Sequence, residues 1–71
     1  MNDTEIATEA AVRIINTLIY NKGISVEKLF NFLNSNPPYR EFLNDDNTLI
    51  CMMHDDSLDK FIDMMGEALN E

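Results

Sequence analysis

Five carboxylates recur at every fourth position in the last seventeen residues of the chain. We call this set the acidic ridge: Asp55, Asp59, Asp63, Glu67 and Glu71. Residues four apart on a helix are surface neighbours about 6 Å apart, a step similar to that between phosphates along one DNA strand. Each adjacent pair of like charges destabilises an exposed helix by about 0.2–0.5 kcal/mol. The acidic ridge therefore indicates electrostatic binding rather than catalysis.

Charge is concentrated in the C-terminal part of the chain. Residues 45–71 hold eight acids and one base, Lys60, whereas residues 1–44 hold five acids and four bases. We expect Lys60 to pair with Asp56, one turn back. A field of this sign repels nucleic acid and anionic membranes and attracts basic protein surfaces. We therefore expect a basic protein partner, with no direct nucleic-acid or membrane binding. The alternative is that the acidic ridge only keeps one helix face solvated.

Metal and cofactor chemistry have little support in the sequence. Cys51 and His54 have zinc-ligand spacing, but a structural zinc site needs four ligands and the chain has no second cysteine or histidine. Residues 45–48 begin like a calcium loop, yet Leu49 stands where the fifth loop position requires an oxygen ligand. We expect no metal and no cofactor, with Cys51 in the core and His54 on the surface.

No arrangement of residues predicts an enzyme. The three serines, Ser25, Ser35 and Ser57, suit capping or turn positions, and a lone histidine without a glycine-rich loop makes a weak basis for a catalytic triad. A glycine-rich phosphate loop is absent from the sequence as well.

One short motif has a family resemblance. The sequence Asp56-Ser57-Leu58-Asp59 resembles the phosphopantetheine attachment site of acyl carrier proteins, which are also small, acidic and helical, and the resemblance covers residues 48–65. It implies Ser57 as the attachment serine. Two departures stand against that role: His54 occupies the place of a family glycine, and the sequence ends after the helix that Ser57 opens. We interpret Ser57 as a first-turn helix residue.

Size and composition predict a single domain over residues 1–71. A chain this short buries only about 60% of its unfolded surface, so a monomer is marginally stable. Its 45% hydrophobic content is that of a folded protein, and no apolar run approaches the roughly 20 residues of a membrane span. A single cysteine and the lack of a signal sequence suit a cytoplasmic protein. Its small size and many asparagines would suit a phage or mobile-element protein.

Apolar residues at intervals of three and four predict the helices that position these groups. We expect helices over residues 2–22, 26–34, 38–43 and 48–53, with a last helix that begins at Asp55 or Asp56. Asn2 and Ser25 are expected N-caps, Gly23 a helix stop and residues 44–47 a turn. Residues 48–53 also suit a strand, but no partner strand is predicted. The fold class is all-α: a small compact bundle of four to five helices.

The same periodicity predicts which side chains face the core. On the first helix, Glu9 and Arg13 should pair on the outside. Gly66 lies inside the last helix, where it costs about 1 kcal/mol relative to alanine. The expected core positions are Ala7, Ala11, Ile14, Ile15, Leu18, Ile19, Val26, Leu29, Phe30, Leu33, Tyr39, Phe42, Leu43, Leu58, Phe61, Ile62, Met65, Ala68 and Leu69.

Several apolar side chains exceed what so small a core can hold. Met64 should lie outside it, beside Lys60, and Tyr20, Phe32 and Tyr39 are further candidates. Flexible methionines suit adaptable interfaces, so we place Met64 with the acidic ridge in the partner-binding set. The second hypothesis is a helical homodimer, or a larger homo-oligomer, that buries these residues.

Overall fold

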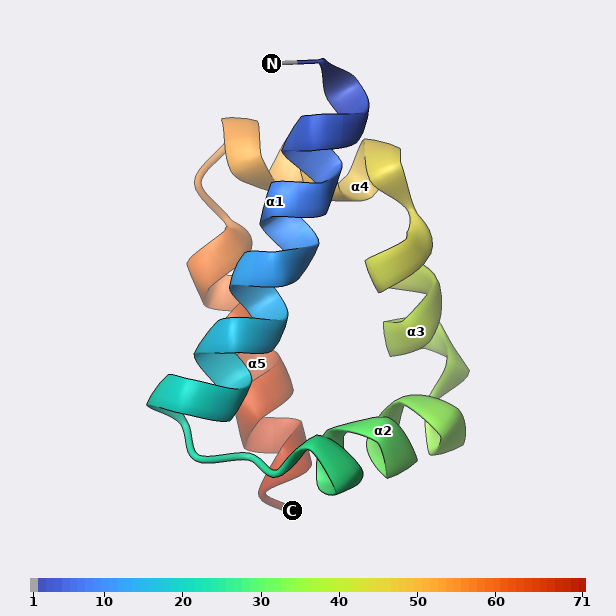
Figure 1. The fold of residues 1–71 in the computed structure, drawn as a ribbon, viewed down its shortest axis with the longest axis vertical. Coiled ribbons are helices and arrows are strands. Elements are labelled where there is room, and N and C mark those ends of the chain that lie inside the picture. Colours follow the sequence, from blue (N-terminus) through green and yellow to red (C-terminus); the bar gives the residue numbers. More distant parts are fainter. Residues whose placement is uncertain (1) are drawn as a thin grey trace.

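The computed structural model describes residues 2–71, which form five α-helices and one π-helical turn. In chain order these are α1 (Asp3–Asn16), η1 (Thr17–Asn21), α2 (Val26–Ser35), α3 (Pro37–Asn44), α4 (Asp46–His54) and α5 (Leu58–Leu69). The chain descends through α1, crosses the lower end as α2, returns through α3 and α4, and descends again as α5 (Figure 1). Residues 2–71 contain no strand, so the all-α prediction is confirmed, including the helix over residues 48–53.

The first helix begins and ends as its sequence predicts. The Asn2 side chain accepts a hydrogen bond from the Glu5 backbone N–H at 2.8 Å, which satisfies one unpaired donor of the first turn. Thr17 keeps helical dihedral angles, so η1 continues α1 without a break. Its wider turn ends with the Lys22 N–H donating to the Thr17 carbonyl at 3.1 Å. Gly23 then adopts a φ of +70°, as expected for a glycine helix stop.

One hydrophobic core joins residues from all the helices except α3, where Tyr39 and Leu43 are partly buried. Phe42 was also predicted for the core, but it is 42% exposed. On α1, Ala7 and Ala10 are buried, whereas Ala11, which was predicted for the core, is only partly buried. The buried side chains are Ala7, Ala10, Ile14, Leu18, Ile24, Leu29, Leu49, Met52, Leu58, Phe61, Ile62, Met65 and Leu69.

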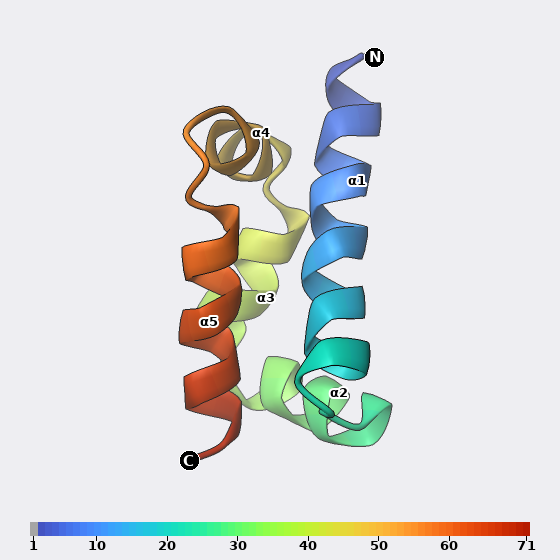
Figure 2. The same cartoon turned by 90° about the vertical axis from the view of Figure 1, so that its left-hand side faces the viewer.

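The predicted inner face of α2 is wrong at three positions. Val26 and Phe30 are 60% and 65% exposed, whereas Phe32, predicted to point away, packs against the core. The cause is tertiary: α2 crosses the lower end of the molecule, so only a narrow strip centred on Leu29 meets the core (Figure 2). The single residue Asn36 joins α2 to α3. The ring centroids of Tyr39 on α3 and Phe32 on α2 are consequently 5.1 Å apart.

The predicted turn over residues 44–47 is also wrong, because only Asp45 separates α3 from α4. Its carboxylate accepts a hydrogen bond from the Thr48 N–H at 3.2 Å and caps α4. Polar residues favoured in turns are also the preferred N-caps, so composition alone did not distinguish the two roles. The α3–α4 junction is consequently tight, and it holds α3 beside the start of α4.

Candidate functional site: the acidic ridge on α5

Only the central three residues of the acidic ridge lie within α5. Asp55 lies in the turn before the helix, and Glu71 follows its end. The predicted cap at Asp55 or Asp56 is wrong, since Ser57 is the N-cap, although its own side chain caps nothing. Asp55 instead accepts a hydrogen bond from the Ser57 N–H at 3.0 Å. The ridge is therefore a helical row of three carboxylates with one carboxylate beyond each end.

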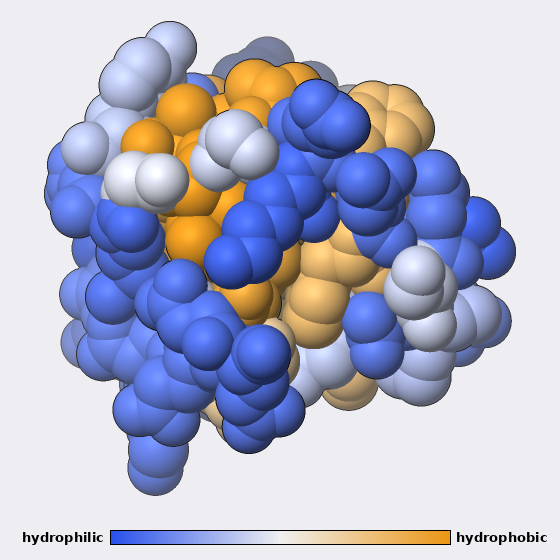
Figure 3. Space-filling view, turned by 90° about the horizontal axis from the view of Figure 1, so that it is seen from below, coloured by the Kyte–Doolittle hydropathy of each residue, from blue (hydrophilic) through white to orange (hydrophobic). Residues whose placement is uncertain are grey.

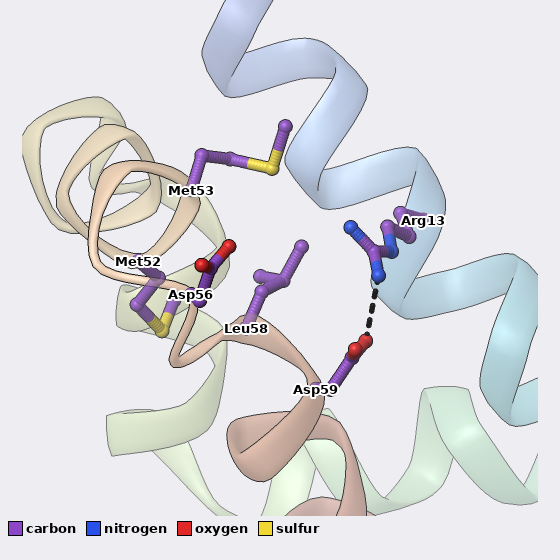
Figure 4. Close-up of a pocket in the computed structure, with 6 residues that line it drawn as sticks. All are labelled: Arg13, Met52, Met53, Asp56, Leu58 and Asp59. Carbon is purple, nitrogen blue, oxygen red and sulfur yellow. Dashed lines mark hydrogen bonds and ion pairs between the residues drawn. The ribbon is translucent and has the colours of Figure 1, made fainter.

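Two basic side chains reach across to the acidic ridge, one from α1 and one from the residue that follows η1. Arg13 Nη2 lies 2.8 Å from Asp59 Oδ1, and Lys22 Nζ lies 2.9 Å from Asp63 Oδ1. These pairs form because α1 and α5 run side by side in the same direction (Figure 2). Figure 4 shows Arg13 extended from α1 towards Asp59. The side chains of Asp59 and Asp63 remain 73% and 69% exposed. Each pair therefore contributes only about 0–1 kcal/mol.

The two ion pairs correct two sequence predictions. Arg13 was expected to pair with Glu9 on its own helix, and Lys60 with Asp56. Within residues 2–71, Arg13 pairs with Asp59 instead, and Asp56 lies in the turn with a φ of +61°, outside the helical spacing assumed for it. The bases that partly neutralise the ridge are thus 41 to 46 residues away in sequence. No local spacing predicts them.

Three ridge carboxylates have no basic side chain of residues 2–71 within 4.0 Å: Asp55, Glu67 and Glu71. Glu67 lies in the last turn of α5, where the helix dipole is negative and no basic residue is present. A cation there would be stabilising. All thirteen carboxylate residues of the chain are exposed, and among residues 2–71 none of the buried residues is polar or charged. The C-terminal end of the ridge is therefore its least compensated part.

Gly66 allows Lys22 to reach Asp63. A Cβ at this buried position would lie 2.8 Å from Cδ of Lys22 and 3.3 Å from its Cε. The aliphatic part of the Lys22 side chain therefore packs against α5 at Gly66, where any other residue would place a Cβ. The unfavourable helix propensity of Gly66 is thus linked to one of the two ion pairs of the ridge.

We expect Gly66→Ala to detach Lys22 from Asp63 and still raise the free energy of unfolding by up to about 1 kcal/mol. The flexible Lys22 side chain can move aside, and alanine favours the helix by about 1 kcal/mol over glycine. Urea unfolding measures the change, with the same substitution in a Lys22→Ala background as the control. There the gain should be larger, since no side chain must move. A loss of stability in both backgrounds would contradict this account of Gly66.

Two junction carboxylates have lowered pKa values. The pKa of Asp45 falls below 3.8 mainly because its carboxylate accepts a hydrogen bond from the side chain of Thr48, and next because it accepts one from the Thr48 backbone N–H. The pKa of Asp55 is lowered in the same way by hydrogen bonds from the side chain and the backbone N–H of Ser57. A group with a depressed pKa in the folded state contributes stability above its unfolded pKa. That contribution is lost as the pH falls through the folded value.

We expect the melting temperature to fall as the pH drops below about 4, and to fall less steeply in the Asp45→Asn, Asp55→Asn double variant. Asparagine keeps the oxygen acceptor but does not titrate. Thermal unfolding followed by circular dichroism between pH 5 and pH 2.5 measures the slope. Asp46→Asn, which removes a carboxylate at the position next to Asp45, is the control. Equal slopes in the double variant and the control would show that the capping bonds do not carry the acid sensitivity.

The other predicted site residues are placed as follows. Met64 is 51% exposed on α5, outside the core, as expected. His54 is exposed as predicted, but Cys51 is exposed as well, which corrects its assignment to the core. The side chains of α4 that turn inward are Leu49 and Met52, so Cys51 lies on the outer face. Within residues 2–71, no cluster of three His, Cys, Asp or Glu side chains could hold a metal ion.

Comparisons of the chain with protein-family models, curated proteins and solved structures gave no match. Among residues 2–71, none of the helices combines the length and apolar character needed to cross a membrane.

Proposed function

We propose that this protein is a small binding module that docks the acidic ridge on a basic protein surface. The partner is a nucleic-acid-binding protein, which the module inhibits or regulates by occupying its phosphate-binding groove, in the manner of a DNA mimic. The observation that carries the proposal is the row Asp59, Asp63 and Glu67 on the exposed side of α5, extended by Asp55 and Glu71. Carboxylates four residues apart follow a step of about 6 Å, similar to that of backbone phosphates.

The ion pairs with Arg13 and Lys22 are compatible with docking. Each uses one carboxylate oxygen, Oδ1, and a carboxylate has a second oxygen that also accepts hydrogen bonds. Because the carboxylates of both pairs are largely exposed, displacing either base costs little. Glu67 and Glu71 have no such competitor among the side chains of residues 2–71. We therefore expect the partner's arginines to contact the C-terminal end of the ridge most closely. We also propose that the protein is cytoplasmic and that it binds its partner without a cofactor.

A paired capture from a bacterial lysate tests this function. The ridge-neutralised variant carries Asp59→Asn, Asp63→Asn, Glu67→Gln and Glu71→Gln. The control carries Asp3→Asn, Glu5→Gln, Glu9→Gln and Glu27→Gln, which remove the same charge from exposed positions elsewhere. A basic nucleic-acid-binding protein should be retained by the wild type and the control, lost by the ridge-neutralised variant, and released by added salt. If all three baits retain the same proteins, or only themselves, the ridge is merely a solvated face.

A second candidate, a homo-oligomer, is favoured by the lower end of the molecule. Tyr20, Val26 and Phe30 are 79%, 60% and 65% exposed there. Figure 3 shows apolar side chains gathered on this end, between polar ones. Residues 16–40, the segment that carries these three side chains, hold three bases and one acid, so the segment itself adds no net negative charge to this end, where the C-terminal end of α5 also lies (Figure 1).

We expect any self-association to depend on this lower end. A melting temperature that rises with protein concentration, and that loses this dependence in Phe30→Ser, would support the homo-oligomer. A concentration-independent melting temperature in the wild type would exclude it.

A further inference from the structure

Two hollows open on the surface formed by α3, α4 and α5. One, of about 230 Å³, is lined by Pro38, Glu41, Phe42 and Asp45. The other, of about 260 Å³, is lined by Met52, Ser57, Lys60, Phe61 and Met64. The rings of Phe42 and Phe61, one from each lining, meet edge to face with centroids 5.6 Å apart. We call the surface made by Phe42, Met52, Phe61 and Met64 the apolar groove.

The apolar groove has the size and composition of a site for side chains. Each hollow is smaller than the roughly 300–1,000 Å³ of pockets that hold a cofactor or drug-sized ligand. Phe42 and Met64 are 42% and 51% exposed, so apolar surface is accessible without unfolding. Methionine and phenylalanine linings adapt to apolar anchors of varied shape. These properties suit leucine-sized or phenylalanine-sized anchors spaced three or four residues apart on a partner helix.

The charges around the apolar groove select the rest of that helix. Glu41 and Asp45 line the first hollow, and Glu67 follows Met64 by three residues on α5. Lys60 is the only base among residues 41–71, against nine acids. A helix that places its apolar face in this groove therefore meets Lys60 at the second hollow, and carboxylates at the first hollow and beyond Met64. Lysine and arginine are the side chains that complement them.

We propose that the apolar groove binds a basic amphipathic helix of the partner protein. The groove takes the apolar anchors, and Glu41, Asp45 and Glu67 attract the flanking bases. This inference rests on the proposed function, because it assigns the partner's segment to a second surface of α5, adjacent to the acidic ridge. It adds a requirement that charge alone does not impose: the partner's apolar residues must lie on one helix face.

Two synthetic peptides test the groove. One is an 18-residue helix of leucine and lysine with a single tryptophan on its apolar face; the other has the same composition, permuted so that the leucines surround the helix. The protein has no tryptophan, so peptide fluorescence reports binding directly. The amphipathic peptide should bind with a blue shift and at least tenfold more tightly than the permuted one. The substitutions Met64→Gln and Phe42→Ser should each weaken binding of the amphipathic peptide about tenfold. Phe30→Ser, on α2, should not.

A second readout separates binding at the groove from loss of folding. With ¹³C-methyl methionine, the amphipathic peptide should shift the Met52 and Met64 methyl signals of the wild type and leave that of fully buried Met65 unchanged. Equal affinity for both peptides, or unchanged affinity in Met64→Gln and Phe42→Ser, would overturn the groove. The proposed function would then stand if the ridge-neutralised variant still bound both peptides more weakly. Absence of binding by either peptide would overturn both.

Discussion

Leu18→Ala is expected to remove about half of the free energy of unfolding of the protein. Leu18 is completely buried in η1, where its side chain lies near Gly66 of α5. Truncation of a buried leucine to alanine costs about 2–5 kcal/mol, because the site cannot fully collapse around the cavity. At about 0.05–0.15 kcal/mol per residue, a chain of 71 residues has a total stability of roughly 4–10 kcal/mol. One substitution thus removes about half of it.

Urea unfolding followed by helical circular dichroism measures this effect. Val12→Ala is the matched control, since Val12 lies on the same helix and is 49% exposed. It should change the free energy of unfolding by no more than about 0.5 kcal/mol. Similar midpoints for Leu18→Ala and Val12→Ala would mean that η1 does not seal the core as described.

The second large effect is expected at Gly23. With a φ of +70°, Gly23 has a backbone conformation that costs an L-amino acid about 1–2 kcal/mol. A Cβ at this position would meet no other atom within 4 Å beyond the adjacent residues, so the strain comes from the backbone alone. Gly23→Ala should lower the free energy of unfolding by about 1 kcal/mol, after the reduced entropy of its unfolded chain is considered.

Gly23→Asn provides the control for this interpretation. Asparagine has the same lack of steric conflict but tolerates the left-handed region better than alanine, so its loss should be smaller. Gly66→Ala should change stability in the opposite direction, because Gly66 is helical. If Gly23→Ala proved as stable as the wild type, the helix would end in a different conformation from the one described.

Local signals predicted the fold class and most helix ends. Asn2, Ser25 and Gly23 act within three residues of their own positions, through side-chain caps and a permitted φ, so the sequence around them is sufficient. The helix over residues 48–53 was likewise predictable, once no partner strand could be found for it.

The errors arise where tertiary packing decides. Phe30 and Phe32 are two residues apart, and periodicity favoured burial of Phe30. The position of α3, through Tyr39, partly buries Phe32 instead. Cys51 is exposed because α4 contacts the core through Leu49 and Met52. Such choices depend on the angle between helices, which a hydrophobic pattern does not contain.

The candidate site divides in the same way. Spacing identified the carboxylates and exposed Met64, because a helix repeats its faces every three to four residues. It could not identify Arg13 and Lys22 as their partners, because those contacts exist only where α1 lies beside α5. Nor could it find the apolar groove, which depends on Phe42 of α3 meeting Phe61 of α5.

Affinity for nona-arginine, measured by calorimetry at low salt, tests most directly whether the acidic ridge is the binding surface. The ridge-neutralised variant and the control with Asp3→Asn, Glu5→Gln, Glu9→Gln and Glu27→Gln each lose four negative charges, so total charge cannot account for a difference between them. We expect the ridge-neutralised variant to bind at least tenfold more weakly than the control, and the control to remain close to the wild type. Equal affinities of the two variants would contradict the account, since binding would then follow net charge and not its arrangement on α5.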